Sequence, residues 1–304
     1  MTDEYQVRTL TLRAGKVATL VRLSPSGTAD KAILYVHGFA DYFFQRHVAE
    51  HFTAQGYDFY AVDLRAYGRS LRDGDTPNFV ADLTEHFEEL DAAVEMITGD
   101  GHETLTVMAH STGGLITPLW LDARQNEKID SLVLNSPWFE LAENRLNKTV
   151  VTALLKVIGR FAPKLVVRKG MGPVYVQSTH RDYRGEWDYD LNMKPLGAFP
   201  VLAGWIRAIR IAHARLQRGL DINVPILVLH SSRSLLHTTA WSPEAMKADT
   251  VLDVADMIRF APGLGKDVTV VAIPDGMHDL FLSAEPGRQR TFEEVDSWLA
   301  KHHP

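Results

Sequence analysis

The stretch that decides the fold is Val107-Met108-Ala109-His110-Ser111-Thr112-Gly113-Gly114, an apolar run that leads into a serine and two glycines. The pattern predicts a strand, a sharp turn at Ser111 and then a helix, which is the arrangement of a nucleophile elbow. Small neighbours, here with His110 and Gly113 as supporting residues, let strand and helix pack around a strained turn. The usual motif is Gly-x-Ser-x-Gly, and Ala109 replaces its first glycine, so an ordinary glycine-rich turn stays an alternative.

A catalytic serine also requires a base, because its hydroxyl is a poor nucleophile at neutral pH. The candidate is His278, which follows the apolar run 268–273 and the turn Pro274-Asp275-Gly276. A turn after the last expected strand projects an imidazole over the edge of a sheet. Any one of the 13 histidines is by default a loop residue without a catalytic task, and this position distinguishes His278 from the others.

An oxyanion hole is predicted after another buried strand, residues 32–36, which leads into His37-Gly38-Phe39. A His-Gly turn there directs the backbone N–H of Phe39 toward the serine, and the N–H of Thr112 provides the second donor. His37 and Gly38 then support the turn. The plain alternative is a simple connection between a strand and a helix. The later segment Asp63 to Ser70 is expected to be structural.

Together these motifs resemble the α/β hydrolases of the lysophospholipase and monoacylglycerol-lipase-like group, which includes sequences labelled serine aminopeptidases. The matching parts are the oxyanion turn His37-Gly38, the Asp-x-Arg-Gly-x-Gly-x-Ser loop at Asp63 to Ser70 with Ala66 for its first glycine, the elbow from Ala109 to Gly113, and His278. The match is loose over residues 138–221. The resemblance implies an α/β-hydrolase fold, the chain order Ser…Asp…His and a serine nucleophile, and it leaves the substrate open.

The triad acid follows from the same resemblance. In the family it usually lies just after the strand that here reads Pro225 to His230, yet Ser231 to Lys247 contains no aspartate. Ala248 to Asp253 resembles an Ala-Asp-x-Val-x-Asp segment whose first aspartate orients the histidine, so we expect Asp249 to be the acid. The alternatives are Asp253 and, more remotely, Glu244. Ser231 to Lys247 is then an inserted loop, in which Trp241-Ser242-Pro243-Glu244 predicts a short helical turn.

Strands and helices alternate along the chain, which predicts a mostly parallel sheet covered by helices on both faces. The interval between Asn135 and Pro225 is much longer than a single crossover needs. We therefore expect one domain over 1–304, with a core of 1–137 and 222–304 and a helical cap over 138–221. The expected strands are 6–13 and 17–23 as a hairpin, then 32–37, 57–62, 105–109, 131–135, 226–230 and 268–273, with helices near 43–55, 78–97, 113–125, 250–260 and 288–301.

Composition limits the function classes. The 304 residues include 32 basic and 38 acidic ones, which gives a net charge of −6. The chain therefore lacks the excess of positive charge that is typical of proteins that bind nucleic acid. There is no cysteine, so disulfides, thiolate catalysis and zinc–cysteine sites are excluded. The N-terminal sequence has neither the basic nor the apolar segment of a secretory signal, and we expect a soluble, cytoplasmic protein.

The expected cap carries an unusual charge, because no Asp or Glu occurs between Asn144 and Arg181. This predicts either a solvated face or a transient contact with an anionic lipid surface. The apolar run Val150 to Ile158 is either a core helix of the cap or a wall for an acyl chain. The basic residues of this part are Arg145, Lys148, Lys156, Arg160, Lys164, Arg168, Lys169 and Arg181.

Three other functions compete with ester hydrolysis. His47-Val48-Ala49-Glu50-His51 fits the His-x-x-Glu-His pattern of zinc peptidases, but it lies on a stripe suited to packing and no third ligand stands out. A non-catalytic ligand-binding protein usually lacks a triad member, whereas Ser111 and His278 are both present. A serine peptidase or thioesterase stays open, since acyl transfer is common to all of them. We expect a serine carboxylester hydrolase that needs no cofactor or metal and acts on esters with an apolar chain.

Overall fold

The computed structural model describes residues 5–24, 29–142 and 157–302, and its centre is one eight-stranded sheet. The strand order is β1-β2-β4-β3-β5-β6-β9-β10, in which β1, β2 and β4 pair antiparallel and all later pairs are parallel. The predicted opening hairpin and mostly parallel sheet are confirmed. The strands are β1 (Gln6–Thr11), β2 (Val17–Leu23), β3 (Lys31–Val36), β4 (Tyr57–Asp63), β5 (Thr104–His110), β6 (Ser131–Asn135), β9 (Ile226–Ser231) and β10 (Val268–Ile273).

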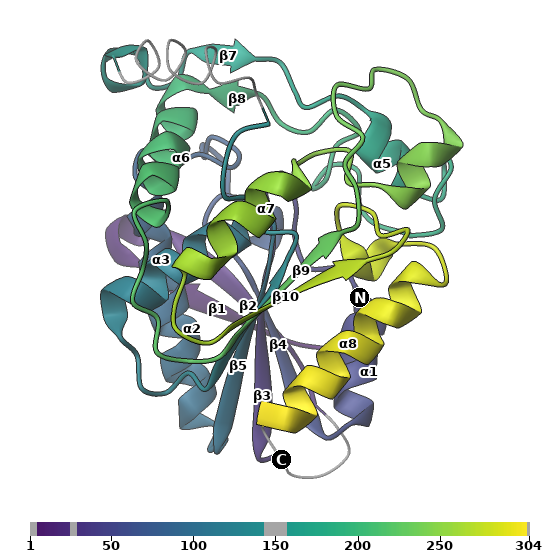
Figure 1. The fold of residues 1–304 in the computed structure, drawn as a ribbon. Coiled ribbons are helices and arrows are strands. Elements are labelled where there is room, and N and C mark those ends of the chain that lie inside the picture. The colour runs from purple at the N-terminus through teal and green to yellow at the C-terminus, as the bar shows by residue number, and fades with distance from the viewer. Residues whose placement is uncertain (1–4, 25–28, 143–156, 303–304) are drawn as a thin grey trace.

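Helices cover both faces of this sheet (Figure 1). One face packs on α1 and α8, where Phe52 and Trp298 join one apolar core, and the other packs on α2, α3, α6 and α7 around Trp120. The strands between the two layers are buried along nearly their whole length, which is why they read as continuous apolar runs. The helices are α1 (Arg46–Ala54), α2 (Phe87–Gly99), α3 (Gly113–Arg124), α6 (Ala203–Leu216), α7 (Val254–Phe260) and α8 (Gly287–His302).

Helices α2 and α7 begin later than the sequence predicts, and in each case a polar side chain marks where the helical segment starts. Asp82 and Glu85 form a capping box that opens a 3₁₀ turn, η3 (Leu83–His86), ahead of α2. Asp253 accepts a hydrogen bond from the N–H of Ala255 and so starts α7 at Val254. The remaining 3₁₀ turns are η1 (Arg13–Gly15), η2 (Gly68–Ser70), η4 (Pro243–Lys247), η5 (Ala261–Gly263) and η6 (Leu280–Leu282), of which η4 confirms the predicted turn near Pro243.

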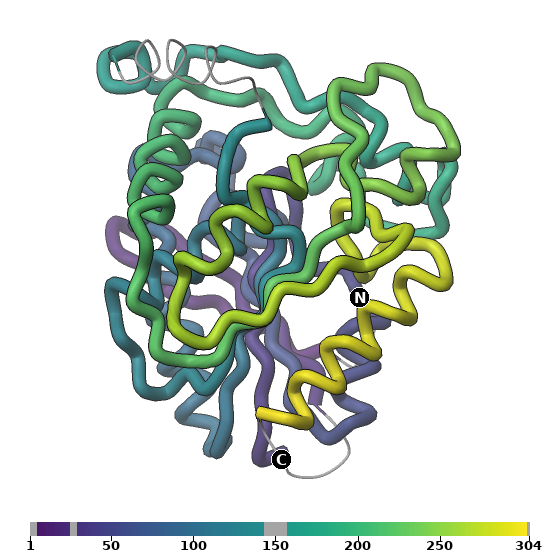
Figure 2. Tube along the Cα trace, in the orientation of Figure 1, coloured from purple at the N-terminus to yellow at the C-terminus, as the bar shows by residue number. Residues whose placement is uncertain are grey.

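The described residues between β6 and β9 lie over the carboxyl ends of the strands before the chain returns to the sheet at β9 (Figure 2). They contain α6 and three short elements: β7 (Val166–Arg168), α5 (Val174–Thr179) and β8 (Val201–Leu202). Residues 157–161 are helical, whereas Arg145, Lys148, Lys156 and most of the apolar run Val150 to Ile158 lie outside the described residues. The division of the chain into a core and a cap over 138–221 stays a prediction.

None of the described helices combines the length and the apolar character that crossing a bilayer requires.

Candidate active site

Ser111 occupies the sharp turn between β5 and α3, with a φ of +52°. This left-handed conformation costs a non-glycine residue on the order of 1–3 kcal/mol, and the surrounding packing enforces it. A Cβ atom on Gly113 would lie 2.6 Å from the carbonyl oxygens of His37 and Val36, and one on Gly114 would lie 2.7 Å from the Cβ of Pro137. Both glycines are therefore required for helix α3 to approach the sheet.

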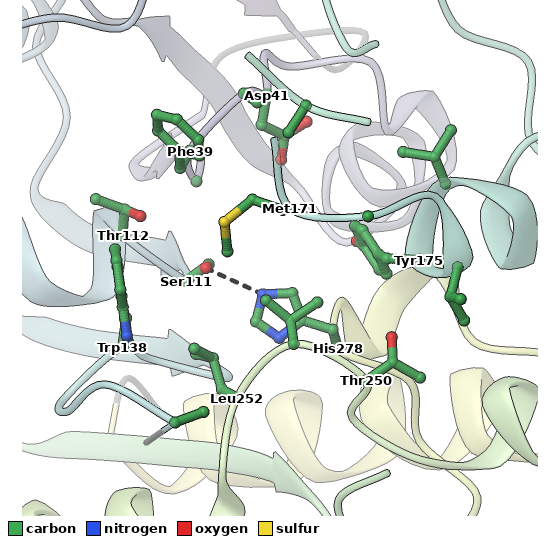
Figure 3. Close-up of a pocket in the computed structure, with 18 of the residues that line it drawn as sticks. Phe39, Asp41, Ser111, Thr112, Trp138, Met171, Tyr175, Thr250, Leu252 and His278 are labelled. Atoms are coloured by element: carbon green, nitrogen blue, oxygen red, sulfur yellow. Dashed lines mark hydrogen bonds between the residues drawn. The ribbon is translucent and has the colours of Figure 1, made fainter. Parts of the chain in front are cut away.

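The structure brings Ser111, His278 and Asp249 together at the carboxyl edge of the sheet. Figure 3 shows the contact between Ser111 and His278. His278 Nε2 lies 3.0 Å from Ser111 Oγ, and His278 Nδ1 lies 2.8 Å from Asp249 Oδ2. The Nδ1–H donates to the carboxylate, so the lone pair of Nε2 faces the serine hydroxyl. All three side chains are buried. This geometry permits proton transfer from the serine to the histidine.

Asp249 reaches this position because the long loop after β9 closes on itself. The N–H of Asp249 donates to the carbonyl of Arg233 at 3.0 Å, and the N–H of Leu235 donates to the carbonyl of Asp249 at 2.7 Å. Residues 233–235 come just after β9, so Asp249 lies beside the end of that strand despite its later place in the chain. The N–H groups of Val251 and Leu252 both donate to Asp249 Oδ1 at 2.8 Å, which leaves Oδ2 for His278.

The two alternative acids have other contacts. Asp253 is the N-cap of α7, and its Oδ1 accepts from the N–H of Ala255 at 3.0 Å. Glu244 is exposed and pairs with Arg233 at the surface. Neither of them contacts His278.

The backbone of the oxyanion turn is held by the ring of His37. Its Nδ1–H donates to the carbonyl of Gly38 at 2.8 Å, and its Nε2 accepts from the N–H of Leu64 at 3.0 Å. Burial lowers the pKa of His37, so the ring stays neutral and keeps both bonds. Because the Gly38 carbonyl points at His37, the N–H of Phe39 in the same peptide unit points the opposite way. Within the described residues, no acceptor is bonded to the N–H of Phe39 or Thr112.

The segment from Asp63 to Ser70 packs against the loop that follows His37 and Gly38. Asp63 Oδ1 accepts from the N–H of Phe43 at 3.0 Å, and Oδ2 accepts from the Arg69 guanidinium at 2.6 Å. Ser70 Oγ donates to the Asp63 carbonyl at 2.6 Å. These contacts hold the loop after the oxyanion turn against β4, as expected of a structural segment.

His110, the residue before Ser111, is a second buried imidazole. Its ring centroid lies 4.8 Å from that of His278, and its Nδ1 donates to the carbonyl of Asn135 at 3.1 Å. Burial lowers its pKa to about 4, with His278 acting in the same direction and Asp279 opposing it. His110 is therefore neutral at physiological pH and serves as packing and a hydrogen-bond donor.

A cavity of about 360 Å³ opens over Ser111 and His278. One side is apolar, and Phe39, Trp138, Met171 and Leu252 surround the serine there (Figure 3). Tyr175 lies beside His278, with their ring centroids 5.4 Å apart. The further lining residues are Gly38, Ala40, Asp41, His110, Thr112, Ala142, Arg168, Gly172, Val174, Val176, Lys194, Pro195, Ala198, Leu236, His237, Thr238, Thr250 and Val251.

The cavity also has a polar corner, which we define as Asp41, Tyr175 and Lys194. Lys194 Nζ donates to Asp41 Oδ1 at 2.7 Å and also lies within 5.7 Å of three aromatic ring centroids. Burial acts to raise the pKa of Asp41, but Lys194, with smaller effects of two nearby histidines, lowers it below its usual range. Asp41 Oδ2 and the Tyr175 hydroxyl are buried and have no partner among the described residues.

The sequence interpretation did not identify the polar corner. Asp41 lies only four residues after His37, so its closeness to the predicted oxyanion turn could have marked it as a candidate site residue. Lys194 and Tyr175 come from the segment between β6 and β9, where no motif marks them. Only the fold brings them to the cavity that Ser111 also lines.

The His-x-x-Glu-His segment contributes to packing. The ring of His47 stacks on Trp187 with centroids 4.1 Å apart, and its Nε2 donates to the carbonyl of Phe281. His51 Nε2 contacts the carboxylate of Asp296 at 2.9 Å. Among the residues that the structure describes, no group of three His, Cys, Asp or Glu side chains is arranged to hold a metal ion.

Comparisons with known proteins agree with this architecture. The chain is 28% identical over 275 residues to a monoacylglycerol lipase of Mycolicibacterium smegmatis, a match that covers 89% of this chain and 88% of the relative. It is 27% identical over 275 residues to phospholipase YtpA of Bacillus subtilis, covering 89% and 95%. A soluble variant of the Saccharomyces cerevisiae monoglyceride lipase, solved with a substrate analogue, superimposes with a TM-score of 0.73 over 99% of this chain and 96% of that one, at 17% identity.

These relatives confirm the predicted fold and the predicted resemblance to the monoacylglycerol-lipase-like group of α/β hydrolases. Their names are those of ester-cleaving enzymes, in agreement with the predicted serine carboxylester hydrolase. A family model described as serine aminopeptidase, S33, matches residues 27–285. The chain therefore belongs to the S33 serine aminopeptidase family of α/β hydrolases.

Proposed function

We propose that this protein is a serine carboxylester hydrolase whose nucleophile, base and acid are Ser111, His278 and Asp249. The observation that carries the proposal is the position of the His278 ring, with Nε2 3.0 Å from Ser111 Oγ and Nδ1 2.8 Å from Asp249, at the floor of a cavity. A buried histidine bonded in this way to a serine and a carboxylate supports nucleophilic acyl transfer.

In the proposed mechanism Ser111 Oγ attacks the ester carbonyl while His278 Nε2 accepts its proton. Asp249 fixes the tautomer of the ring and stabilises the imidazolium that forms. The negative charge on the former carbonyl oxygen is bound by the N–H groups of Phe39 and Thr112. His278 returns the proton to the departing alcohol, and a water molecule then cleaves the acyl-enzyme through the same steps in reverse order. Neither a metal nor a cofactor is required.

The two sides of the cavity support a substrate with an apolar chain and a polar alcohol. Phe39, Trp138 and Met171 provide an apolar wall, whereas the polar corner offers unpaired acceptor and hydroxyl groups. A monoacylglycerol-like or lysophospholipid-like ester has both parts, and the names of the two sequence relatives point to the same class. A peptidase or thioesterase would use the same triad, so substrate profiling must separate them.

We further propose that the protein contacts anionic lipid surfaces through a basic–apolar strip, defined as residues 160–169. Phe161 is 80% exposed, and Leu165, Val166 and Val167 are exposed as well. The strip contains four basic residues and no acidic one, and within the described residues none of its basic side chains is in an ion pair. Arg168 also lines the cavity, so the strip leads to its mouth. The basic residues are Arg160, Lys164, Arg168 and Lys169.

The decisive experiment compares wild type with Ser111→Ala on p-nitrophenyl esters of increasing chain length, a monoacylglycerol, a lysophospholipid, an acyl thioester and a peptide amide. We expect the wild type to cleave medium and long esters best, and Ser111→Ala to lose about 10⁶-fold in kcat and all labelling by a fluorophosphonate. Unchanged circular dichroism and melting temperature serve as the control for folding. Near-wild-type turnover by Ser111→Ala would falsify the mechanism, and preferred cleavage of the thioester or the peptide would favour the competing function.

A further inference from the structure

Asp279, the residue directly after His278, is a fully buried carboxylate that the proposed reaction does not use. Its Oδ1 accepts hydrogen bonds from Asn135 Nδ2 at 2.7 Å and from the N–H of Phe281 at 3.2 Å, and its Oδ2 accepts from Gln45 Nε2 at 3.0 Å. No lysine or arginine of the described residues pairs with it. A carboxylate buried without a cation is costly unless hydrogen bonds compensate, so all three donors are needed.

The first of these donors connects Asp279 to the nucleophile. Asn135 is the last residue of β6, and its carbonyl accepts from the N–H of Ser111 and from His110 Nδ1, both at 3.1 Å. Its side-chain oxygen accepts from the N–H of Leu280 at 3.2 Å. The side chain of Asn135 thus bonds to two residues after His278, namely Asp279 and Leu280. Its backbone carbonyl bonds to the turn at Ser111.

Another donor connects Asp279 to the oxyanion loop. Gln45 ends the loop that begins at His37, and it is 1% exposed. Its Nε2 also donates to the hydroxyl of Tyr35 on β3 at 3.2 Å, and its Oε1 accepts from the N–H of Phe44 at 3.0 Å. The carboxylate of Asp279 is therefore the point at which the elbow, the oxyanion loop and the histidine loop are joined.

We propose that Asp279 is a positioning residue for His278, and that its carboxylate fixes the ring between Ser111 and Asp249. The inference rests on the proposed function, in which His278 is the base. The carboxylate is required rather than its shape alone, because an amide at position 279 would direct an N–H group toward Asn135 Nδ2 or Gln45 Nε2 and deprive that donor of its acceptor. Since Asp279 follows His278 in the chain, any displacement of its backbone moves the imidazole.

The test is Asp279→Asn in the full-length protein, with kcat and KM measured for p-nitrophenyl butyrate. We expect kcat to fall by about 10- to 100-fold while KM stays within about two-fold, because a displacement of the order of 1 Å impairs proton transfer more than binding. Labelling by a fluorophosphonate should slow by a similar factor. The downfield ¹H NMR resonance of the His278 Nδ1 proton should shift or broaden, which a loss of stability alone would not cause.

The matched control is Asp58→Asn, because Asp58 is also a buried carboxylate but lies at the amino end of β4 and pairs with Arg22. We expect this variant to lose stability and to keep kcat within about two-fold of wild type. Should Asp279→Asn not fold, Gln45→Met takes its place, since it keeps the carboxylate of Asp279 and removes the donor to its Oδ2, together with the contacts of Gln45 to Tyr35 and Phe44. For Gln45→Met we expect a smaller loss in kcat, of about three- to ten-fold, and the same change in the resonance.

The inference is overturned if folded Asp279→Asn keeps kcat within two-fold, if Asp58→Asn loses as much kcat, or if Gln45→Met leaves both kcat and the resonance unchanged. If the wild-type protein cleaves no ester, the proposed function fails by itself. The NMR resonance of His278 and the labelling of Ser111 still report whether Asp279 sets the geometry of the ring, so the two failures are distinguishable.

Discussion

Among single residues, Asp249 is the one whose two carboxylate oxygens have clearly different partners. Oδ1 accepts from the N–H groups of Val251 and Leu252, and Oδ2 faces His278 Nδ1. An amide in its place would direct either its NH₂ group or its oxygen at the ring, and the NH₂ group favours the imidazole tautomer that carries its proton on Nε2. That tautomer cannot accept the proton of Ser111.

We therefore expect Asp249→Asn to lower the acylation rate by about 10⁴-fold, by analogy with other Ser-His-Asp enzymes. Asp253→Asn provides the matched control, because Asp253 only caps α7 and its loss should cost about 1 kcal/mol in the free energy of unfolding. Stopped-flow measurement of the acylation burst, together with urea unfolding, checks both variants. If Asp253→Asn impairs acylation more than Asp249→Asn does, the acid has been assigned to the wrong residue.

Local sequence pointed to Ser111, His278 and the oxyanion turn as candidates, because each follows a buried strand at a turn of recognisable composition. Asp249 could be selected only through the resemblance, since nothing in the loop composition shows that residues 233–235 close on it. The pair of Asp41 and Lys194 and the contacts of Asp279 with Asn135 and Gln45 join residues more than a hundred positions apart. Such contacts depend on the order of the strands, and no local pattern encodes that order.

Among the elements, the strands were predicted most accurately, because strands buried on both faces read as continuous apolar runs. Helix α6 was missed even though Trp205, Ile209 and Ala212 recur at helical spacing on its buried side. The short pair β7 and β8 has no such signal, since all three residues of β7 are exposed. Strands of two or three residues arise from tertiary context rather than from their own composition.

The basic–apolar strip makes a prediction at the same scale. Replacing Arg160, Lys164 and Lys169 by Gln should reduce binding to anionic phosphatidylglycerol vesicles at low salt, because the attraction acts between the cations and the lipid charge. The difference from wild type should shrink as the salt concentration rises. Phe161→Ser should weaken binding at every salt concentration, since it removes the most exposed apolar side chain. Co-sedimentation with vesicles measures both effects.

The matched control for the strip replaces Lys128, Lys266 and Lys301 by Gln, which removes the same charge from exposed positions near the amino ends of the strands. Hydrolysis of p-nitrophenyl acetate should be unchanged in every one of these variants, because the triad is untouched. Equal vesicle binding by the strip variant and its control would show that residues 160–169 are only a solvated surface.

For the molecule as a whole, buried neutral histidines predict instability in acid. The pKa of His110 is lowered by burial to about 4, and that of His37 is lowered as well. A histidine in the unfolded chain has a pKa near 6.5, so between these values the unfolded state binds more protons and is favoured as the pH falls. His110 therefore costs no stability above about pH 6.5. Below that pH the free energy of unfolding falls, and the loss due to His110 reaches roughly 3 kcal/mol at pH 4.

Urea unfolding at pH 7 and pH 5 measures this loss directly. We expect the free energy of unfolding of His110→Asn to fall less between the two pH values than that of wild type, since the asparagine does not titrate and its amide still offers a donor to Asn135. His237→Asn, at an exposed histidine, should keep the wild-type dependence. An unchanged pH dependence in His110→Asn would assign the acid sensitivity to other groups.

Two backbone hydrogen bonds join residues 233–235 to Asp249, and they fix both ends of the loop between these residues. Residues 236–248 therefore begin and end at the same fixed place in the fold. Three of them, Leu236, His237 and Thr238, line the cavity. Under the proposed function, substrate preference and catalytic alignment thus depend on separable stretches of one loop. Residues 236–248 can therefore be lengthened, shortened or replaced, in evolution or by design, to reshape one wall of the cavity. Asp249 keeps its position beside His278 throughout.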